Sequence, residues 1–328
     1  MGTIFTFQGA KKIIFGHRGC HELAREISTL GGKKAFIVLD RALSELEAVR
    51  QVVDLLETEG VALVLYNEIT PEPAPELADR GATLAKQEGC DVVIGIGGGS
   101  SLDVAKAIAA LVTNPGKAED YIGLEKVTQP GLPTIMIPTT AGTGSEVTFT
   151  AVFTMREKKR KGGINSHLMY PDVALLDPEL TLSLPPRPTA TTGIDALTHA
   201  IEAYTSLQAN PMSDMVAQNA IRLIGNNLRR VMDNGQDQQG RSHMLLGSLM
   251  GGLALASAGV GACHALAYSL GAFFDIPHGL ANAVLLPFIM EFNMEGAKEK
   301  YERVGALMQP DNAGSMGSPS SENTGEML

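Results

Sequence analysis

Short apolar runs alternate with amphipathic segments through the first 180 residues. Residues 34–39, 61–66, 91–96 and 134–137 read as strands, each followed by a turn signal, and residues 173–176 are a further candidate. Between them, residues 46–59 and 77–88 have the apolar spacing of helices. Strands separated by helices of this length indicate βαβ units and a parallel sheet, with ligands bound at the carboxyl ends of the strands.

The pattern changes after two consecutive prolines, Pro185 and Pro186, which cannot continue a regular element. Helices are predicted for residues 188–204, 212–232, 238–256 and 278–289, with no convincing strand between them. We therefore expect an α/β domain over residues 1–184 and an all-helical domain over residues 185–308. Residues 309–328 are rich in Gly, Ser, Pro and Asn, which predicts a disordered tail.

Composition narrows the class of protein. The 328 residues are 44% hydrophobic and 19% charged, which allows a packed core. The net charge of −10 argues against nucleic acid and anionic membrane surfaces as partners. Three widely spaced cysteines and no recognisable secretory signal favour a cytoplasmic protein. Residues 242–274 carry no Asp, Glu, Lys or Arg, but their glycines and histidines favour a helix pair buried in a protein core over a membrane span.

A glycine triplet, Gly97-Gly98-Gly99, joins an apolar strand to a helix that is expected to open at Ser100. Ser100 and Asp103 have the spacing of a capping box. Glycines let the backbone approach a bulky anion, and the first helical turn offers free N–H groups to phosphate. A plain strand-to-helix turn is the other interpretation.

Two more polar clusters follow predicted strands. Asp40 ends the strand FIVLD, where a carboxylate can bind the ribose hydroxyls of NAD and repel the 2′-phosphate of NADP. It precedes the glycines, however, which does not fit an ordinary Rossmann order, so a turn residue is the alternative. The segment PTTAGTGSEVT (138–148) offers hydroxyl and backbone donors suited to phosphate or ribose, or is simply a loop.

The helical half holds the most specific pattern. Asp195 and His199 are four residues apart and share one face of a mostly apolar helix, while His264 and His278 lie in a second apolar stretch. Each histidine alone is more often a core residue than a ligand. Together, one Asp and three His form a plausible site for Fe²⁺ or Zn²⁺, and the residue types do not separate the two metals.

Four segments in order resemble the iron-containing (group III) alcohol dehydrogenases. They are GGGSSLDVAK (97–106), PTTAGTGSEVT, DPELTLSLPPRPTATTGIDALTHAIEAY (177–204) and CHALAYSLGAFFDIPHGLANAVLLP (263–287). The resemblance runs from about residue 3 to residue 308. It implies a dinucleotide-binding α/β domain joined to an all-helical metal domain, the dehydroquinate synthase-like architecture.

The resemblance also implies roles for individual residues. The metal ligands fall on the four residues already found, and Asp40 falls on the acid that favours NAD. The remaining cofactor contacts fall on Gly97, Gly98, Gly99, Ser100, Thr139, Thr140, Thr143, Thr148 and Lys161. Tyr268 replaces a histidine that many members carry, and Phe288 replaces another. Members continue with further helices where this chain reaches its Gly/Ser tail, so we expect a truncated helical domain.

The expected function is a metal- and NAD-dependent alcohol dehydrogenase that oxidises a small primary alcohol or reduces the matching aldehyde. His264, His278 and Tyr268 are the expected catalytic residues, and a homo-oligomer is the expected assembly. Two alternatives stay open: a lyase or polyol dehydrogenase on the same scaffold, or a truncated, inactive relative.

Overall fold

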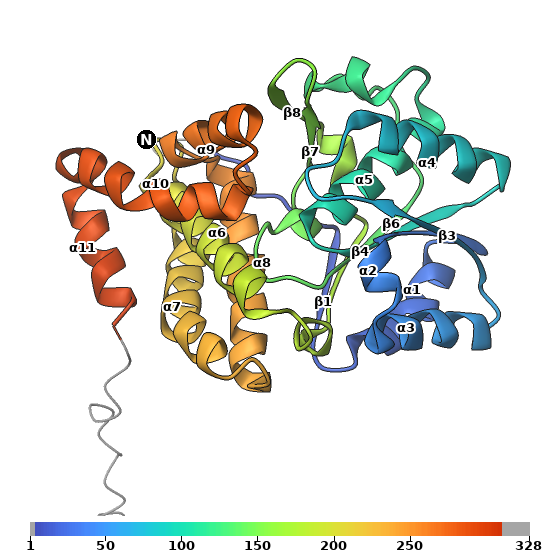
Figure 1. The fold of residues 1–328 in the computed structure, drawn as a ribbon, viewed down its shortest axis with the longest axis horizontal. Helices are drawn as coiled ribbons and strands as arrows, with labels where there is room; N and C mark the ends of the chain where they lie inside the picture. The colour runs from blue at the N-terminus through green and yellow to red at the C-terminus, as the bar shows by residue number, and fades with distance from the viewer. Residues whose placement is uncertain (1–3, 310–328) are drawn as a thin grey trace, which may run out of the picture.

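A six-stranded parallel sheet forms the first half of the structure, a computed structural model that describes residues 4–309 (Figure 1). Its strand order is β1-β9-β6-β4-β2-β3, and every neighbouring pair is parallel. The strands are β1 (Lys12–Phe15), β2 (Lys34–Asp40), β3 (Ala62–Ile69), β4 (Val92–Gly97), β6 (Thr134–Pro138) and β9 (Val173–Leu176). The predicted parallel sheet is confirmed, although β1 was missed.

Helices cover both faces of this sheet because its central strands are apolar throughout. Along β2, Ile37 packs with the core beneath α1 and α3, whereas Phe36 packs on the other face with α4 and α5. The helices of this half are α1 (Leu23–Thr29), α2 (Arg41–Ser44), α3 (Glu47–Thr58), α4 (Pro75–Gln87) and α5 (Gly99–Thr113). The sheet therefore exposes its carboxyl edge, where β2, β4 and β6 end, to the second half of the molecule.

A small second sheet, not predicted from the sequence, lies beside α5. Strands β7 (Thr150–Met155) and β8 (Arg160–Asn165) form an antiparallel hairpin, and β5 (Gly123–Leu124) pairs with β8. The hairpin carries the predicted cofactor residue Lys161 toward the helical half, where β8 contacts α9.

Between Pro186 and Leu307, all the elements that the structure describes are helical, as predicted. They are α6 (Pro186–Thr205), α7 (Pro211–Asp233), α8 (Gln238–Ala258), α9 (Ala262–Phe274), α10 (His278–Asn293) and α11 (Lys298–Leu307), with a short 3₁₀ turn (Met294–Gly296) between α10 and α11. Pro186 is the first residue of α6, where its missing N–H costs nothing. The helix therefore begins two residues before the predicted start. Of the predicted tail, residues 310–328 lie outside the described residues.

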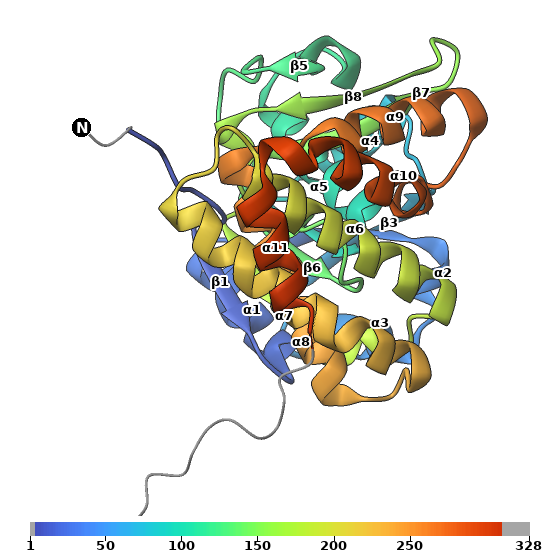
Figure 2. The ribbon, with the colours of Figure 1, turned by 90° about the vertical axis from the view of Figure 1, so that its left-hand side faces the viewer.

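The two halves meet through a contact between backbones. Gly144, in the loop after β6, has φ +61°, and a Cβ atom there would lie 2.5 Å from the Cα of Gly252 on α8. A Cβ on Gly252 would likewise lie 2.8 Å from Gly144. Val147 of the same loop belongs to the hydrophobic core of the helical half. In Figure 2 the helical half faces the viewer and the sheet half lies behind it. The loop after β6 is thus held directly against the helices.

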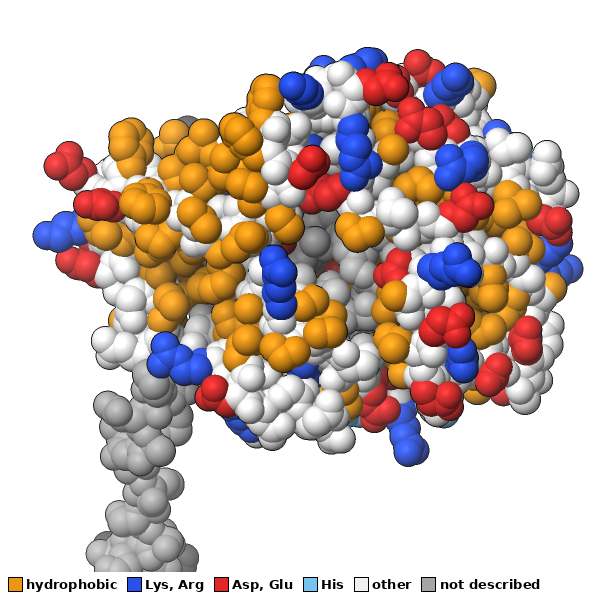
Figure 3. Space-filling view, viewed as in Figure 1, with side chains coloured by type: hydrophobic (Ala, Val, Ile, Leu, Met, Phe, Trp, Pro, Cys, Tyr) orange, Lys and Arg blue, Asp and Glu red, His pale blue; other side chains and the backbone are white. Residues whose placement is uncertain are grey.

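One surface of the helical half is strongly apolar. The apolar face, as we call it, gathers on α9 and α10 (Figure 3) and consists of Leu266, Phe273, Phe274, Val284, Phe288 and Phe292. No single helix in residues 4–309 is long and apolar enough to cross a membrane; α8 and α9 meet that description only together and are bent by 102° at their junction. Helix α8 is largely buried, as predicted for this stretch, whereas α9 exposes part of the apolar face.

Candidate metal and cofactor site

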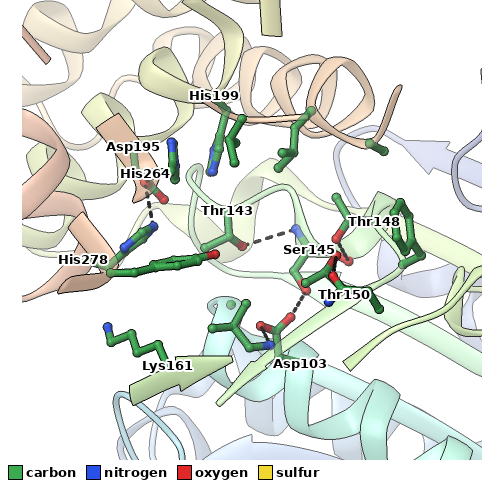
Figure 4. Close-up of a pocket in the computed structure, with 18 of the residues that line it drawn as sticks. Asp103, Thr143, Ser145, Thr148, Thr150, Lys161, Asp195, His199, His264 and His278 are labelled. Atoms are coloured by element: carbon green, nitrogen blue, oxygen red, sulfur yellow. Dashed lines mark hydrogen bonds and ion pairs between the residues drawn. The ribbon is translucent and has the colours of Figure 1, made fainter. Parts of the chain in front are cut away.

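A cavity of about 560 Å³ lies between the carboxyl edge of the sheet and the helical half (Figure 4). The predicted site residues that line it are Gly99, Ser100, Thr143, Thr148, Lys161, Asp195, His199, His264, Tyr268 and His278. Asp40, Gly97, Gly98, Thr139 and Thr140 are not among its lining residues. The cavity therefore joins the predicted cofactor loops to the predicted metal ligands.

The predicted metal ligands converge from three helices. Asp195 and His199 lie one turn apart on α6, and His264 enters from α9; each offers a ligand atom within 4.8 Å of the others. His278 opens α10, with its Nε2 3.5 Å from Asp195 Oδ1. The rings of His199 and His264 stack with centroids 4.4 Å apart. In Figure 4 these side chains point toward one another at one end of the cavity.

Burial and mutual charge set the protonation of this cluster. Burial works to raise the pKa of Asp195, but the neighbouring histidines outweigh it and hold that pKa well below its usual range. Burial lowers the pKa of His199 to about 4. Burial would also lower the pKa of His264, but hydrogen bonding to Asp195 and Glu202 raises it to about 9. The cluster thus holds an ionised Asp195 beside a neutral His199, whereas His264 must release a proton to bind a divalent cation.

The donor set fits a divalent transition metal. It consists of imidazole nitrogen and carboxylate oxygen atoms alone, which suit Fe²⁺ and Zn²⁺. The Nδ1 atoms of His199 and His278 are buried and have no hydrogen-bond partner among the described residues. Asp195, His199 and His264 each offer one ligand atom within 4.8 Å of the others in a buried cluster, and this convergence of donor atoms supports a bound cation.

Tyr268 lies beside the ligands on α9. Its ring is 5.4 Å from that of His278, centroid to centroid, and it lines the cavity. Burial raises the pKa of Tyr268 to about 12. The hydroxyl therefore stays protonated near neutral pH, so it can donate a hydrogen bond but is a poor base.

The glycine turn starts α5, but the predicted capping box is wrong. The helix begins at Gly99 with Gly98 as its N-cap, so Ser100 lies inside the first turn. Gly97 has φ +147°, and a Cβ there would lie 2.6 Å from Ser101 Oγ, so this position requires glycine. The Asp103 carboxylate makes no capping hydrogen bond; it accepts hydrogen bonds from Ser145 Oγ at 2.5 Å and from the Val152 backbone N–H at 2.8 Å instead.

A buried lysine anchors the threonine loop, by which we mean residues 138–148. Lys106, on α5, is fully buried; its Nζ donates to the Ser145 carbonyl at 3.0 Å and to the Thr150 carbonyl, and lies 3.2 Å from Asp103. At the other end of the loop, the Thr139 N–H donates to the Gly97 carbonyl at 3.0 Å. The loop is therefore tied to both the glycine turn and α5, which fixes Thr143 and Thr148 at the cavity wall.

Asp40 lies at the end of β2, as predicted, but it also has a structural role. Its carboxylate accepts a hydrogen bond from the Leu43 N–H at 2.9 Å and caps α2. Leu43 lies beside the glycine turn, since a Cβ on Gly97 would come within 3.0 Å of its side chain. Asp40 is thus close to the glycine turn but outside the cavity.

Lys161 forms an ion pair with Glu72, a residue that was not predicted from the sequence to belong to the site. The side chain of Lys161 is 2% exposed, and Glu72 also accepts a hydrogen bond from Thr154 Oγ1 at 3.2 Å. Glu72 adopts φ +54° in the loop before α4, an uncommon conformation for a residue other than glycine. The pair lines the cavity near Gly271 of α9, where a Cβ would lie 2.7 Å from Lys161 Nζ.

Two more residues of the metal cluster were missed, Glu202 and Asn282. Glu202 Oε2 lies 2.6 Å from His264 Nδ1, and Asn282 Nδ2 donates to Asp195 Oδ1 at 2.7 Å. Both had a signal in the sequence. Glu202 follows His199 by three residues on one helix, and Asn282 follows His278 by four, so each shares a helical face with a ligand.

Comparison with known proteins agrees with this geometry. The family model described as iron-containing alcohol dehydrogenase matches residues 10–178, and the model described as the C-terminal part of the Fe-containing alcohol dehydrogenase family matches residues 189–326. The chain belongs to the iron-containing alcohol dehydrogenase family. The resemblance inferred from the four segments is thereby confirmed.

Individual proteins similar to this chain align with most of its length. Long-chain-alcohol dehydrogenase 1 of Geobacillus thermodenitrificans is 45% identical over 274 residues, which are 83% of this chain and 69% of that protein. A crystal structure of 1,3-propanediol oxidoreductase is 38% identical with a TM-score of 0.91, over 95% of this chain and 82% of that one. Sulfoacetaldehyde reductase from Bifidobacterium kashiwanohense, solved in complex with NAD⁺, is 29% identical with a TM-score of 0.84, over 93% of this chain and 85% of that one.

Proposed function

We propose that this chain is a metal-dependent, NAD-linked alcohol dehydrogenase that oxidises a small primary alcohol or reduces the matching aldehyde. The observation that carries the proposal is one cavity shared by two sets of residues. The start of α5 and the threonine loop lie at one end, and Asp195 with three histidines lies at the other.

The proposed cofactor contacts follow from this arrangement. The first turn of α5, at Gly99 and Ser100, offers backbone N–H groups and the positive end of a helix dipole to a pyrophosphate. Thr143, Thr148 and Lys161 line the same cavity as the histidines. Asp40, beyond the cavity, is proposed to accept the ribose hydroxyls at the adenosine end and so to favour NAD over NADP.

The proposed ligands are Asp195, His199, His264 and His278, which would hold Fe²⁺ or Zn²⁺. A divalent cation there supplies Lewis acidity toward an alcohol or carbonyl oxygen. Tyr268, protonated and beside His278, would donate a hydrogen bond in the path by which the substrate proton leaves.

Apolar side chains support a small, uncharged substrate. Phe149, Val152, Leu255 and Val260 line the same cavity and give it apolar surface. Lys161 is the one Lys or Arg among its described lining residues, and its charge is already paired with Glu72. A lyase that acts on a phosphorylated or carboxylated substrate needs several basic groups, so the dehydrogenase is favoured.

An activity assay tests the proposal. Protein loaded anaerobically with Fe²⁺, or with Zn²⁺ in parallel, is mixed with NAD⁺ and a series of primary alcohols, and NADH is followed by its absorbance. We expect NADH to form with at least one alcohol and to be lost when the metal is removed. Failure of protein with one bound metal per chain to turn over any alcohol, or any matching aldehyde with NADH, would contradict the proposal.

We further propose a reducing compartment, the cytoplasm, and a homo-oligomer. Cys20, Cys90 and Cys263 are each buried and free, which suits a compartment that keeps thiols reduced. The apolar face supports self-association, because Phe288 and Phe292 are 67% and 83% exposed within it. Light scattering of the wild type and of Phe288→Ser tests this, since the variant should shift the assembly toward monomer.

A further inference from the structure

The two ends of the His264 side chain lie in different environments. Its Nδ1 is 2.6 Å from Glu202 Oε2, whereas its Nε2 faces Asp195 Oδ1 at 3.6 Å. An ionised carboxylate accepts hydrogen bonds only, so Glu202 requires the proton on Nδ1. The lone pair of a neutral His264 is then on Nε2, the nitrogen that faces the proposed metal.

Glu202 itself is held by the start of α9. Its Oε1 accepts a hydrogen bond from the Cys263 N–H at 2.7 Å, in the first turn of that helix. Gly261, just before α9, leaves the space for this carboxylate, because a Cβ there would lie 2.7 Å from Glu202 Oε1. A negative charge at a helix N-terminus is favourable. The hydrogen bond from Cys263 therefore links Glu202 of α6 to the start of α9, one residue before the proposed ligand His264.

Asn282 holds the second proposed ligand of this kind, the carboxylate of Asp195, by a hydrogen bond. Its side chain is fully buried, and its Nδ2 donates to Asp195 Oδ1 at 2.7 Å. The same nitrogen lies 3.1 Å from His264 Nε2 and 3.3 Å from His278 Nε2, two contacts that a bound cation would replace, whereas the hydrogen bond to Asp195 is compatible with one. Asn282 thereby links α10 to α6 and limits the rotation of the carboxylate.

We propose that Glu202 and Asn282 are positioning residues of the metal site: Glu202 fixes the ring of His264 with Nε2 toward the cation, and Asn282 fixes the carboxylate of Asp195. Partners of this kind determine how well ligands are oriented and how tightly a metal is held. Glu202 also adds charge, since Asp195 and Glu202 together carry two negative charges against a divalent cation. The inference rests on the proposed metal site.

Metal binding rather than activity tests this role. Co²⁺ is the probe, because its affinity can be measured by competition with a chelator and its visible absorption reports the coordination geometry. We expect Glu202→Gln and Asn282→Ala to weaken Co²⁺ binding by about 10- to 100-fold and to change the absorption bands. A purely structural contribution would lower stability without changing the spectrum of the bound Co²⁺.

The matched control is Glu26→Gln. Glu26 is likewise a buried carboxylate, 1% exposed, but it pairs with Lys12 at 2.7 Å in the sheet half. Its replacement should leave Co²⁺ affinity within threefold of the wild type.

A second variant covers the case in which a buried substitution prevents folding. Gly261→Ala keeps all the ligands and Glu202 itself, and Gly261 has an extended backbone, with φ −113°, outside the left-handed region that favours glycine. The new methyl group should displace the Glu202 carboxylate and so weaken Co²⁺ binding, as Glu202→Gln does.

The outcomes separate this inference from the proposed function. Unchanged Co²⁺ affinity and spectra in Glu202→Gln, Asn282→Ala and Gly261→Ala, together with loss of binding in His264→Ala, would overturn the positioning role and leave the metal site intact. Unchanged binding in His264→Ala as well would overturn both.

Discussion

Glu146 makes stability depend on pH in a direction that can be predicted. It lies in the threonine loop, 1% exposed, and its Oε1 has no hydrogen-bond partner among residues 4–309. Burial raises the pKa of Glu146 to about 7, although its own backbone N–H and the charge of Lys106 work in the opposite direction. Glu146→Gln keeps the size of the side chain and removes the ionisation.

The sign follows from proton binding in the two states. In the unfolded chain the carboxyl ionises near its ordinary pKa of 4.5, whereas in the folded chain its pKa is about 7. Between these values the unfolded state binds fewer protons, so the wild type loses stability as the pH rises. Over the interval from pH 5 to pH 8 the loss is about 2–3 kcal/mol, at 1.36 kcal/mol per pKa unit. The glutamine variant lacks this loss.

Urea unfolding at pH 5, 6, 7 and 8, followed by circular dichroism because the chain has no tryptophan, measures the difference. We expect the free energy of unfolding of Glu146→Gln, relative to the wild type, to rise by about 2–3 kcal/mol from pH 5 to pH 8. Comparing the two proteins cancels the other titrating groups that they share. Glu26→Gln, which breaks an ion pair, should be less stable than the wild type at pH 8. A pH-independent difference for Glu146→Gln would refute the reasoning.

Three further predictions concern the site. His264→Ala should lose the bound metal and the activity, whereas His243→Ala on the same helical half should keep both; metal analysis of the two proteins checks this. Asp40→Ser keeps a residue that can cap α2 but removes the charge, so it should weaken NAD⁺ and improve NADP⁺ by a total of about 1–3 kcal/mol in relative kcat/KM; equal use of both cofactors by the wild type would contradict it. Gly252→Ala should press on Gly144, lower the free energy of unfolding by about 1–3 kcal/mol and raise the KM for NAD⁺ more than that for the alcohol; thermal melts and initial rates measure both effects.

The parallel sheet was predictable because its central strands are buried on both faces. Such strands appear in a sequence as continuous apolar runs, as residues 34–39 and 91–96 do. The hairpin of β7 and β8 was not predictable. The sequence of β8, RKGGIN, has two charges and two glycines, and its apolar and polar residues do not alternate. Its conformation depends on pairing with β7, which sequence spacing does not reveal. The division at residues 184 and 185 stays a prediction.

The metal cluster was predictable to the extent that helical spacing reports one face of one helix. Asp195 and His199 were found in this way. Glu202 and Asn282 also share a helical face with a ligand, but spacing does not reveal the contacts that give them a role, because His264 is 62 residues from Glu202 and Asp195 is 87 residues from Asn282. The capping box failed for the related reason that the partners of Asp103 come from the threonine loop and β7.

The contact between Gly144 and Gly252 has a consequence for changing the substrate range. Because neither Gly144 nor Gly252 has a side chain that could repack, a shift of α8 at this contact moves the threonine loop directly. Leu255 and Ala256, which line the cavity, follow Gly252 by about one turn of the same helix. Enlarging the cavity at these positions therefore acts on the cofactor loop as well as on the alcohol. Selection for bulkier alcohols at α8 should yield enzymes whose affinity for NAD⁺ changes in step with their substrate preference.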